Sequence, residues 1–221
     1  MKIVRREQWI IERCRGKTVL HLGCTDSPMT EQKLEQGGLL HLKLLAVSKQ
    51  VIGVDIDGPA LSLLALKAKV PDLYLHDIEH IDTLPVRATL DIVLAGEVVE
   101  HLNNVGAFFD SCKKLLSNNQ RSVLIVTVPN AFSAKRFLMA CLFRKEHVHP
   151  DHSAYFSPST LSCIARRHSL RIIGLHGYIW ENPKLGNRVA NTVAKIFIAV
   201  FGSLFADGLI AEISACTDDS P

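Results

Sequence analysis

Residues 18–27, TVLHLGCTDS, decide the fold. Val19, Leu20 and Leu22 form a short apolar run with a β-branched residue, which is typical of a strand buried in a parallel sheet. Gly23 follows at once, and a glycine there permits a positive φ and lets a ligand reach backbone N–H groups. The stretch therefore predicts a strand, a small-residue turn and a helix, although a purely structural turn in an α/β protein has the same pattern.

A second strand is predicted by residues 51–57, VIGVDID, and it ends in an acid. Ligands of doubly wound folds bind beyond the carboxyl ends of the strands, where a carboxylate can accept the hydroxyls of a ribose. Asp55 is therefore a candidate ribose ligand. The alternative is that Asp55 and Asp57 only begin the turn before Gly58.

Four motifs in this order resemble those of class I S-adenosylmethionine-dependent methyltransferases, and they are similar to those of ubiquinone-pathway O-methyltransferases. They are HLGCTDS at 21–27, VIGVDID at 51–57, LHDIEHI at 75–81 and LDIVLAGEVVEHL at 90–102. The resemblance runs from about residue 18 to at least residue 173. It implies an α/β, doubly wound, Rossmann-like sheet of seven strands, mostly parallel with an antiparallel last strand, and S-adenosylmethionine as the cofactor.

The resemblance also implies which residues hold this cofactor. Gly23 would lie under its methionine part, Asp55 would hold the ribose, and Asp77 with Ile78 would meet the adenine. The full expected set is His21, Gly23, Cys24, Thr25, Asp55, Ile56, Asp77, Ile78, Ala95 and Gly96. The family turn usually reads D/E-x-G-x-G-x-G, but here His21 replaces the acid, and Thr25 and Ser27 replace two glycines. We expect the turn to survive with altered hydrogen bonding, which affects the cofactor affinity.

Composition sets broad limits on the protein. Its 221 residues suit one domain, and a formal net charge of +3 is too mild to indicate nucleic-acid binding by itself. The six cysteines form no CxxC pair and indicate small buried residues in a reducing compartment. Residues 1–16 do not resemble a signal peptide, and the longest apolar run, 196–206, is too short to cross a bilayer. We therefore expect a cytoplasmic protein without a membrane span.

We expect a single methyltransferase domain over residues 1–221. Its parts would be an N-terminal helix (1–16), a cofactor-binding core (17–130), a substrate-side insertion (131–160), the C-terminal part of the core (161–215) and a tail (216–221). Periodicity predicts helices at 4–15, 30–49 with a loop at Gly37 and Gly38, 59–69, 105–116, 134–142, 157–168 and 189–201. Further strands are expected at 73–75, 91–95, 122–128, 170–175 and 209–214. In the helix at 59–69, we expect Leu61, Leu64 and Leu66 to be buried.

The segment Glu97-Val98-Val99-Glu100-His101 has the most chemical content. Positions 97, 100 and 101 are spaced i, i+3 and i+4, so their side chains can converge on one side of the backbone. Two carboxylates and an imidazole suit Mg or Mn. The pattern E-x-x-E-H with a later H-x-x-x-F is similar to that of metal-dependent small-RNA 2′-O-methyltransferases. This similarity implies the ligands Glu97, Glu100, His101 and His152.

A metal is not the only interpretation of this segment. Its pattern also occurs in related methyltransferases for which no metal is implied, where the first acid touches the cofactor and the histidine acts as a base or bonds a loop. We therefore predict Glu97, His101 and His152 as catalytic residues, with His101 or His152 removing the proton of a hydroxyl. His147 and His149 are expected to be solvated loop residues. His76 and His80 are expected to be exposed or bonded to nearby backbone.

The preferred function is O-methylation of a small-molecule or saccharide hydroxyl, with the substrate held by residues 131–160. One alternative is an RNA 2′-O-methyltransferase with a metal site. It would bind phosphates with a set of basic residues, namely Lys135, Arg136, Arg144, Lys145, Arg166 and Arg167. The other is a non-catalytic protein with a degenerate methyltransferase fold, which the two replaced glycines would support.

Overall fold

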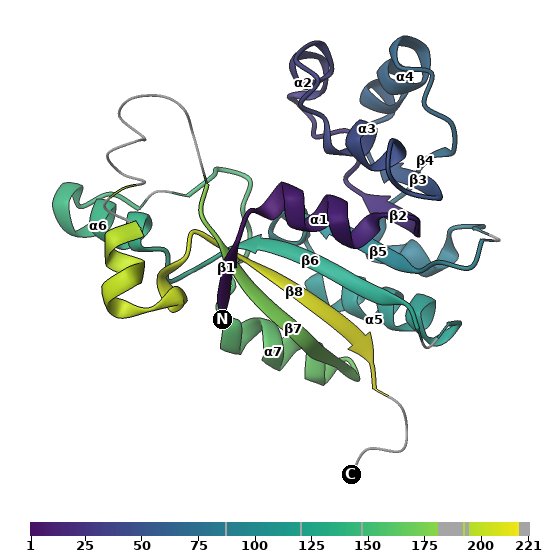
Figure 1. Ribbon diagram of the computed structural model, residues 1–221. Coiled ribbons are helices and arrows are strands. Elements are labelled where there is room, and N and C mark those ends of the chain that lie inside the picture. The colour runs from purple at the N-terminus through teal and green to yellow at the C-terminus, as the bar shows by residue number, and fades with distance from the viewer. Residues whose placement is uncertain (87, 120, 147, 181–191, 193–194, 217–221) are drawn as a thin grey trace.

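An eight-stranded sheet with helices on both faces forms the body of the protein (Figure 1). The computed structural model describes residues 1–86, 88–119, 121–146, 148–180, 192 and 195–216. The strand order is β1-β7-β8-β6-β5-β2-β3-β4. Neighbouring strands are parallel, except that β8 runs antiparallel to both β6 and β7. This confirms the predicted fold class.

The strands are β1 (Lys2–Val4), β2 (Thr18–Leu22), β3 (Gln50–Asp55), β4 (Leu73–Leu75), β5 (Ile92–Gly96), β6 (Val123–Pro129), β7 (Leu170–Tyr178) and β8 (Gly208–Ala215). The α-helices are α1 (Arg6–Cys14), α2 (Thr30–Glu35), α3 (Leu40–Leu45), α4 (Gly58–Lys67), α5 (Val105–Ser117), α6 (Ala134–Phe143) and α7 (Pro158–Arg167), and residues 195–201 are also helical. Short 3₁₀ turns are η1 (Ile78–Thr83), η2 (Val99–His101) and η3 (Ser203–Phe205). No helix among these described residues is long and apolar enough to cross a membrane.

Helix starts follow from side chains that satisfy the free N–H groups of the first turn. Asp57 accepts from the N–H of Ala60 at the start of α4, and Asn104 caps α5 in the same way. Ser157 forms a capping box with Thr160 at the start of α7, where Pro158 occupies the first turn. The helix predicted at 157–168 is therefore confirmed as α7.

The two faces of the sheet bury separate cores. On one face, α5 contributes Phe108 and Phe109, and α7 contributes Leu161. These side chains pack with strand residues that include Leu20 and Val93. On the other face, α1 and α3 pack against the alternate residues of the same strands. The central strands are thus covered on both sides, which explains why their sequences are continuously apolar.

Several sequence expectations need correction. The sheet has eight strands because Lys2–Val4 pairs in parallel with residues 176–178 of β7; three residues are too few for periodicity to reveal. In the segment 30–49, by contrast, the expected loop at Gly37 and Gly38 is confirmed, and it separates the two short helices α2 and α3. Leu66 is 80% exposed, since α4 buries Ala60, Leu61 and Leu64 instead. Of the helix predicted at 189–201, residues 189–191 and 193–194 lie outside the described residues, as do positions 217–221 of the expected tail and His147.

Candidate cofactor and catalytic site

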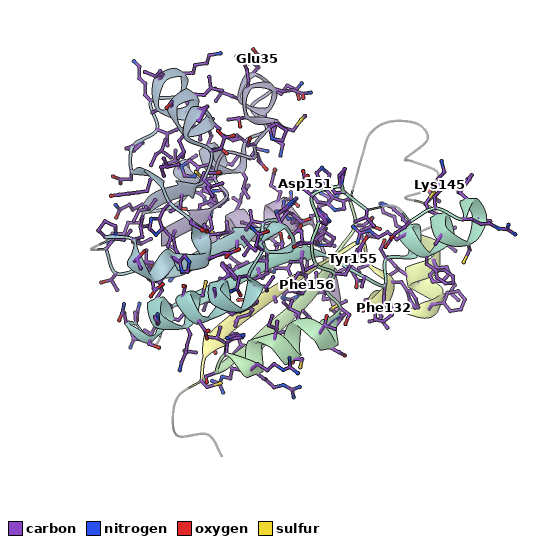
Figure 2. All side chains as sticks on the ribbon, turned by 180° about the vertical axis from the view of Figure 1, so that it is seen from behind. Glu35, Phe132, Lys145, Asp151, Tyr155 and Phe156 are labelled. Carbon is purple, nitrogen blue, oxygen red and sulfur yellow. The ribbon has the colours of Figure 1, made fainter. Side chains whose placement is uncertain are left out.

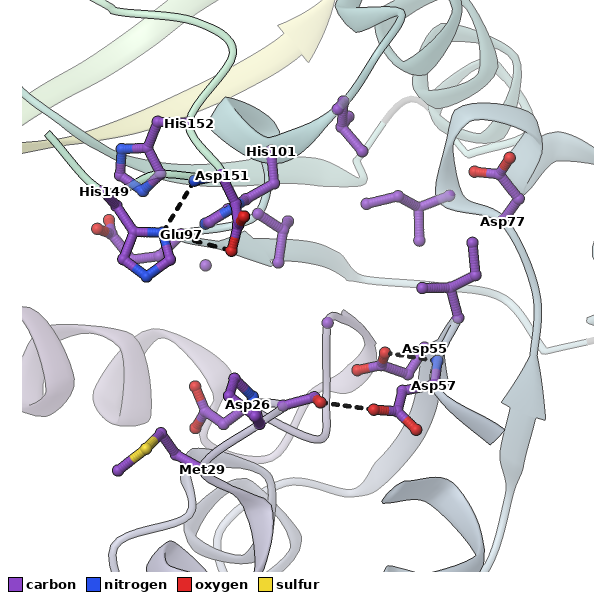
Figure 3. Close-up of a pocket in the computed structure, with 18 of the residues that line it drawn as sticks. Asp26, Met29, Asp55, Asp57, Asp77, Glu97, His101, His149, Asp151 and His152 are labelled. Carbon is purple, nitrogen blue, oxygen red and sulfur yellow. Dashed lines mark hydrogen bonds and ion pairs between the residues drawn. The ribbon is translucent and has the colours of Figure 1, made fainter. Parts of the chain in front are cut away.

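A pocket of about 630 Å³ lies at the carboxyl ends of the central strands (Figure 3). Gly23 after β2, Asp55 at the end of β3 and Gly96 at the end of β5 all line it. The strand order reverses between β2 and β5, because the chain continues from β2 to β3 and β4 on one side and then crosses to β5 and β6 on the other. Ligands of doubly wound folds bind at such a switch point.

Asp55 faces this pocket and is oriented by its neighbours. Its Oδ2 accepts hydrogen bonds from the backbone N–H of Thr25 at 3.0 Å and from the Thr25 hydroxyl at 2.7 Å. Its Oδ1 accepts one from the N–H of Asp57 at 3.1 Å. A carboxylate oxygen has about two acceptor positions, so Oδ1 retains one for a ligand while Oδ2 is occupied by Thr25.

The residues expected to bind the cofactor fall into two groups. Gly23, Asp55, Ile56, Asp77, Ile78 and Gly96 line the pocket. Four others, namely His21, Cys24, Thr25 and Ala95, are buried and are not among the lining residues. His21 contacts His41 of α3 on one face of the sheet, Ala95 is buried in the core of the other face, and Thr25 is hydrogen-bonded to Asp55.

Gly23 requires a glycine for two reasons. Its φ is +69°, and a Cβ built there would collide with the side chain of Val98. The turn after β2 therefore keeps its first glycine, while Thr25 at the second glycine position uses its hydroxyl to hold Asp55. The turn survives with altered hydrogen bonding.

Glu97 is held by groups from three distant parts of the chain. Its Oε1 accepts from the Tyr178 hydroxyl at 2.6 Å and from the Thr127 hydroxyl at 2.9 Å, and Arg6 Nε lies 3.9 Å away. Arg6 also donates to Thr127 Oγ1 at 3.0 Å. A Cβ at Gly96 would lie 2.8 Å from the Arg6 guanidinium, so Gly96 makes room for that side chain.

Three histidines gather on the opposite side of the pocket from Asp55 (Figure 3). His101, His149 and His152 each offer a ring nitrogen, and these atoms all lie within 4.8 Å of one another. Burial and the neighbouring His101 and His149 lower the pKa of His152 to about 4. Burial and the nearby His149 also lower the pKa of His101.

Glu100 lies directly behind these histidines. It is 1% exposed, and neither of its carboxylate oxygens has a hydrogen-bond partner. Its Oε1 is 4.0 Å from His152 Nε2, and the Nδ1 of His152 is also buried without a partner. Burial and the Glu97 carboxylate raise the pKa of Glu100 to about 8. A buried carboxylate without partners is costly, so this is the kind of group that a cation would satisfy.

The loop that supplies His149 and His152 is fixed to η2 by hydrogen bonds. Ser153 donates its N–H to the carbonyl of Glu100 at 2.8 Å and its hydroxyl to the carbonyl of Leu102 at 2.7 Å. This brings His152 beside Glu100 and His101, which are some fifty positions earlier in the chain. His149 is an exposed loop residue, as expected from the sequence, and its half-exposed ring also lines the pocket.

Sequence motifs predict some of the residues in this region and miss others. Motifs predict Asp55, Gly23, His101 and His152 as site residues, and all four line the pocket; His76 bonds the His80 carbonyl as expected. Arg6, Thr127 and Tyr178 were missed because no motif contains them. The Oε1 of Glu97, an expected metal ligand, is engaged by these three residues, and the position of His149 beside His101 and His152 was not predicted. The spacing of His149, three positions before His152, was the one available signal.

The strand order and the switch-point pocket define a Rossmann-like, doubly wound fold, and comparisons with known proteins narrow this class. Residues 35–124 match the family model described as a methyltransferase domain. A ubiquinone biosynthesis O-methyltransferase of Paraburkholderia xenovorans is 24% identical over 220 residues, covering 93% of this chain and 80% of that protein. These matches, together with the fold, support a class I S-adenosylmethionine-dependent methyltransferase.

Solved structures agree on the fold. A SAM-dependent methyltransferase from Archaeoglobus fulgidus superposes with a TM-score of 0.56 at 21% identity, covering 95% of this chain and 91% of that one. The 1,6-didemethyltoxoflavin-N1-methyltransferase of Burkholderia thailandensis, solved with its substrate and S-adenosylhomocysteine, gives a TM-score of 0.52 at 14% identity over 96% of this chain and 78% of that one. At these identities the likeness extends to the fold alone.

Proposed function

We propose that the protein transfers the methyl group of S-adenosylmethionine to a hydroxyl oxygen of a small molecule or saccharide. The observation that carries this proposal is the pocket itself, in which Asp55 faces His101 and His152 across one continuous space. The relative from Paraburkholderia xenovorans, whose name describes an O-methyltransferase, supports an oxygen acceptor.

In this proposal the adenosine part of the cofactor occupies the side of the pocket formed by Asp55, Ile56, Asp77 and Ile78. Asp55 Oδ1 accepts a ribose hydroxyl at its remaining acceptor position. The methionine part lies toward Gly23, which directs the methyl group to the space between Glu97 and the histidines. Asp77 already accepts the N–H of Glu79 through Oδ1 at 2.9 Å, so its other oxygen is left for the adenine edge.

The reaction is a direct displacement. The acceptor oxygen forms a bond to the methyl carbon while the carbon–sulfur bond breaks, and S-adenosylhomocysteine leaves with the electron pair. The hydroxyl proton passes to His101 or His152, because a lowered pKa keeps both rings unprotonated and able to accept a proton at neutral pH. Glu97 lines the same space, and its fixed carboxylate orients the acceptor and stabilises charge near the sulfonium.

The donor set also supports a divalent cation, as the alternative to a histidine base. In that case His101, His149 and His152 would bind it through their ring nitrogens instead of accepting the proton. Glu100 would be the adjacent carboxylate, since Oε1 of Glu97 is engaged by Arg6, Thr127 and Tyr178. This differs from the set expected from the sequence by exchanging Glu97 for His149. A set rich in imidazoles favours Mn over Mg. When bound, the cation would lower the pKa of the acceptor hydroxyl.

The two alternatives have less support. Of the basic residues considered for RNA, Lys135 is bonded to Asp207 at 2.5 Å, and Arg136 donates to the Asn130 carbonyl at 3.3 Å and stacks on Tyr155. These side chains already serve internal contacts. A non-catalytic protein would not need an open pocket with a retained Asp55 and Gly23, so the pocket supports the enzymatic proposal.

The cofactor assignment is tested by calorimetric titration with S-adenosylhomocysteine. Asp55→Ala should weaken binding about 100-fold, because charge-assisted hydrogen bonds to ribose are lost. Asp110→Ala is the matched control, since Asp110 lies on α5, bonds His168 and does not line the pocket. Unchanged affinity in the Asp55 variant would refute the ribose role.

The acceptor is tested by measuring the release of S-adenosylhomocysteine when phenols, catechols or saccharides are offered as substrates. Exclusive methylation of nitrogen acceptors would overturn the oxygen assignment.

The cation is tested by titrating Mn, Zn or Mg into chelator-treated protein. We expect one site that binds Mn or Zn at least tenfold more tightly than Mg, and His149→Ala should weaken it about tenfold or more. His80→Ala, an exposed histidine outside the cluster, should bind as the parent does. Equal affinity in the His149 variant, or full methylation activity in chelator, would rule out this site.

A further inference from the structure

Large apolar side chains gather at one end of the molecule, away from the pocket. On and just before α6 these are Phe132, Phe137, Leu142 and Phe143; on the helix 195–201 and in η3 they are Ile196, Val200, Phe201 and Leu204. We refer to these eight as the apolar patch, and each is between 44% and 71% exposed. They make up half of all large apolar side chains that the described chain exposes. Concentration of this kind marks an interaction surface rather than the usual scatter.

The patch is carried by elements that project from the sheet. Figures 1 and 2 place α6 and the helix 195–201 at the same end of the molecule in opposite views. The base of α6 is fixed to the body, because Lys135 bonds Asp207 and the Asn130 amide donates to the carbonyl of Leu204 at 2.7 Å. The exposed residues therefore belong to anchored helices.

Positive charge accompanies the patch. Residues 131–145 contain four basic residues and no acid. Lys135 and Arg136 are used internally, but Arg144 and Lys145 follow α6 directly, are exposed, and make no hydrogen bond or ion pair with a described side chain. Figure 2 shows Lys145 at the end of α6, beyond Phe132 and Tyr155. Apolar side chains flanked by free cations are the composition of a helix that lies in the interface of an anionic bilayer.

We propose that this end of the protein docks on a lipid bilayer that carries anionic headgroups. The apolar patch would enter the boundary between headgroups and acyl chains, while Arg144 and Lys145 pair with phosphates. A second copy of the chain is disfavoured as the occupant, because a symmetric contact through this surface would place these cations near their own copies. The inference concerns a surface outside the pocket and does not depend on the proposed acceptor.

Flotation with unilamellar vesicles tests the proposal directly. The full chain should float with vesicles of mixed phosphatidylcholine and phosphatidylglycerol and bind phosphatidylcholine alone at least tenfold more weakly. Arg144→Gln with Lys145→Gln should weaken binding to the anionic vesicles about 30-fold, because each basic residue near the surface contributes about fivefold. Phe137→Ser with Phe143→Ser should weaken it at least tenfold.

Matched variants separate this surface from general stickiness. Leu66→Ser with Ile173→Ser removes exposed apolar residues elsewhere, and Lys49→Gln with Arg121→Gln removes exposed charges elsewhere. Both should float as the parent does, and calorimetry with S-adenosylhomocysteine should show that all variants fold. The proposal would be overturned if the chain did not float, or if the control variants lost binding equally. It would also be overturned if a chain that does not float self-associated and Phe137→Ser with Phe143→Ser abolished that self-association.

Discussion

Glu97 has a left-handed backbone conformation, with φ of +58°. For a residue with a side chain this costs about 1–2 kcal/mol, and such residues persist where surrounding contacts fix them. Here the backbone N–H of Glu97 donates to the Thr127 carbonyl at 2.9 Å, and its carboxylate takes the two hydroxyl donors of Thr127 and Tyr178. The carboxylate direction is thus set by residues 30 and 81 positions away.

The Tyr178 hydroxyl provides a test at the scale of one atom. Tyr178→Phe removes one of the two hydroxyl donors to Glu97, so the carboxylate loses its orientation while the buried ring remains in place. We expect kcat to fall about tenfold, the affinity for S-adenosylhomocysteine to stay within about twofold, and the free energy of unfolding to fall by about 1 kcal/mol. Steady-state kinetics and calorimetry measure these. Tyr155→Phe, a change at an exposed tyrosine, should alter none of them, and an unchanged kcat in the Tyr178 variant would contradict the positioning role.

Single residues differ in how far the sequence reveals them. Asp55 and Gly23 are predictable because strand ends in a parallel sheet meet at one edge, so a motif fixes their place. The hydroxyl of Thr25 is harder, since its bond to Asp55 depends on how the turn folds after two glycines are replaced. Tyr178 and His149 are not predictable from local pattern, because only the packed fold brings them to Glu97 and His101.

At the scale of elements, α3 and β2 share a buried histidine pair. His21 and His41 stack with ring centroids 5.3 Å apart, and their Nδ1 atoms are 3.1 Å apart. Burial, followed by His41 and Arg6, lowers the pKa of His21 well below its ordinary value, and burial lowers the pKa of His41 to about 4. His21, expected near the cofactor, therefore faces α3 instead.

This pair predicts a stability that depends on pH. In the unfolded chain His41 takes up a proton below about pH 6.5, whereas the folded state resists protonation down to about pH 4. Folding stability should therefore be highest above pH 6.5 and should fall as the pH drops from 6.5 to 4, by about 3 kcal/mol for this group. Urea unfolding across that range measures the slope. His41→Leu should remove much of it and His80→Leu should not; equal slopes in parent and His41 variant would contradict the assignment.

Elements also show where sequence patterns succeed. Long periodic segments such as α5, and apolar runs such as β2 and β6, fold as predicted because burial on one or both sheet faces dictates their composition. β1 is different: its three residues form a strand only because β7 offers a partner. In α4 the exposed Leu66 shows that composition alone does not give the buried face.

For the whole molecule, the sheet order explains why distant motifs form one site. The parallel strands all end at the same edge, and the reversal between β2 and β5 leaves the pocket between Gly23 and Gly96. The order of motifs predicts this half of the site. The other half depends on the edge of the sheet formed by β1 and β7. Arg6, the first residue of α1 after β1, and Tyr178 of β7 reach Glu97 from there.

That long-range connection predicts a measurable coupling between the two ends of the chain. The Arg6 guanidinium lies 5.9 Å from the centre of the Tyr178 ring, and both side chains act on Glu97. Substitutions of residues that share a hydrogen-bond or ion-pair network are generally not additive in their effect on stability. In a double-mutant cycle of Arg6→Gln and Tyr178→Phe, we expect the free energies of unfolding to deviate from additivity by about 1 kcal/mol. Arg6→Gln combined with Tyr74→Phe is the control, because Tyr74 lies on β4 at the opposite edge of the sheet. Additive losses in the first pair would mean that the N-terminal strand holds Arg6 near Glu97 without energetic consequence.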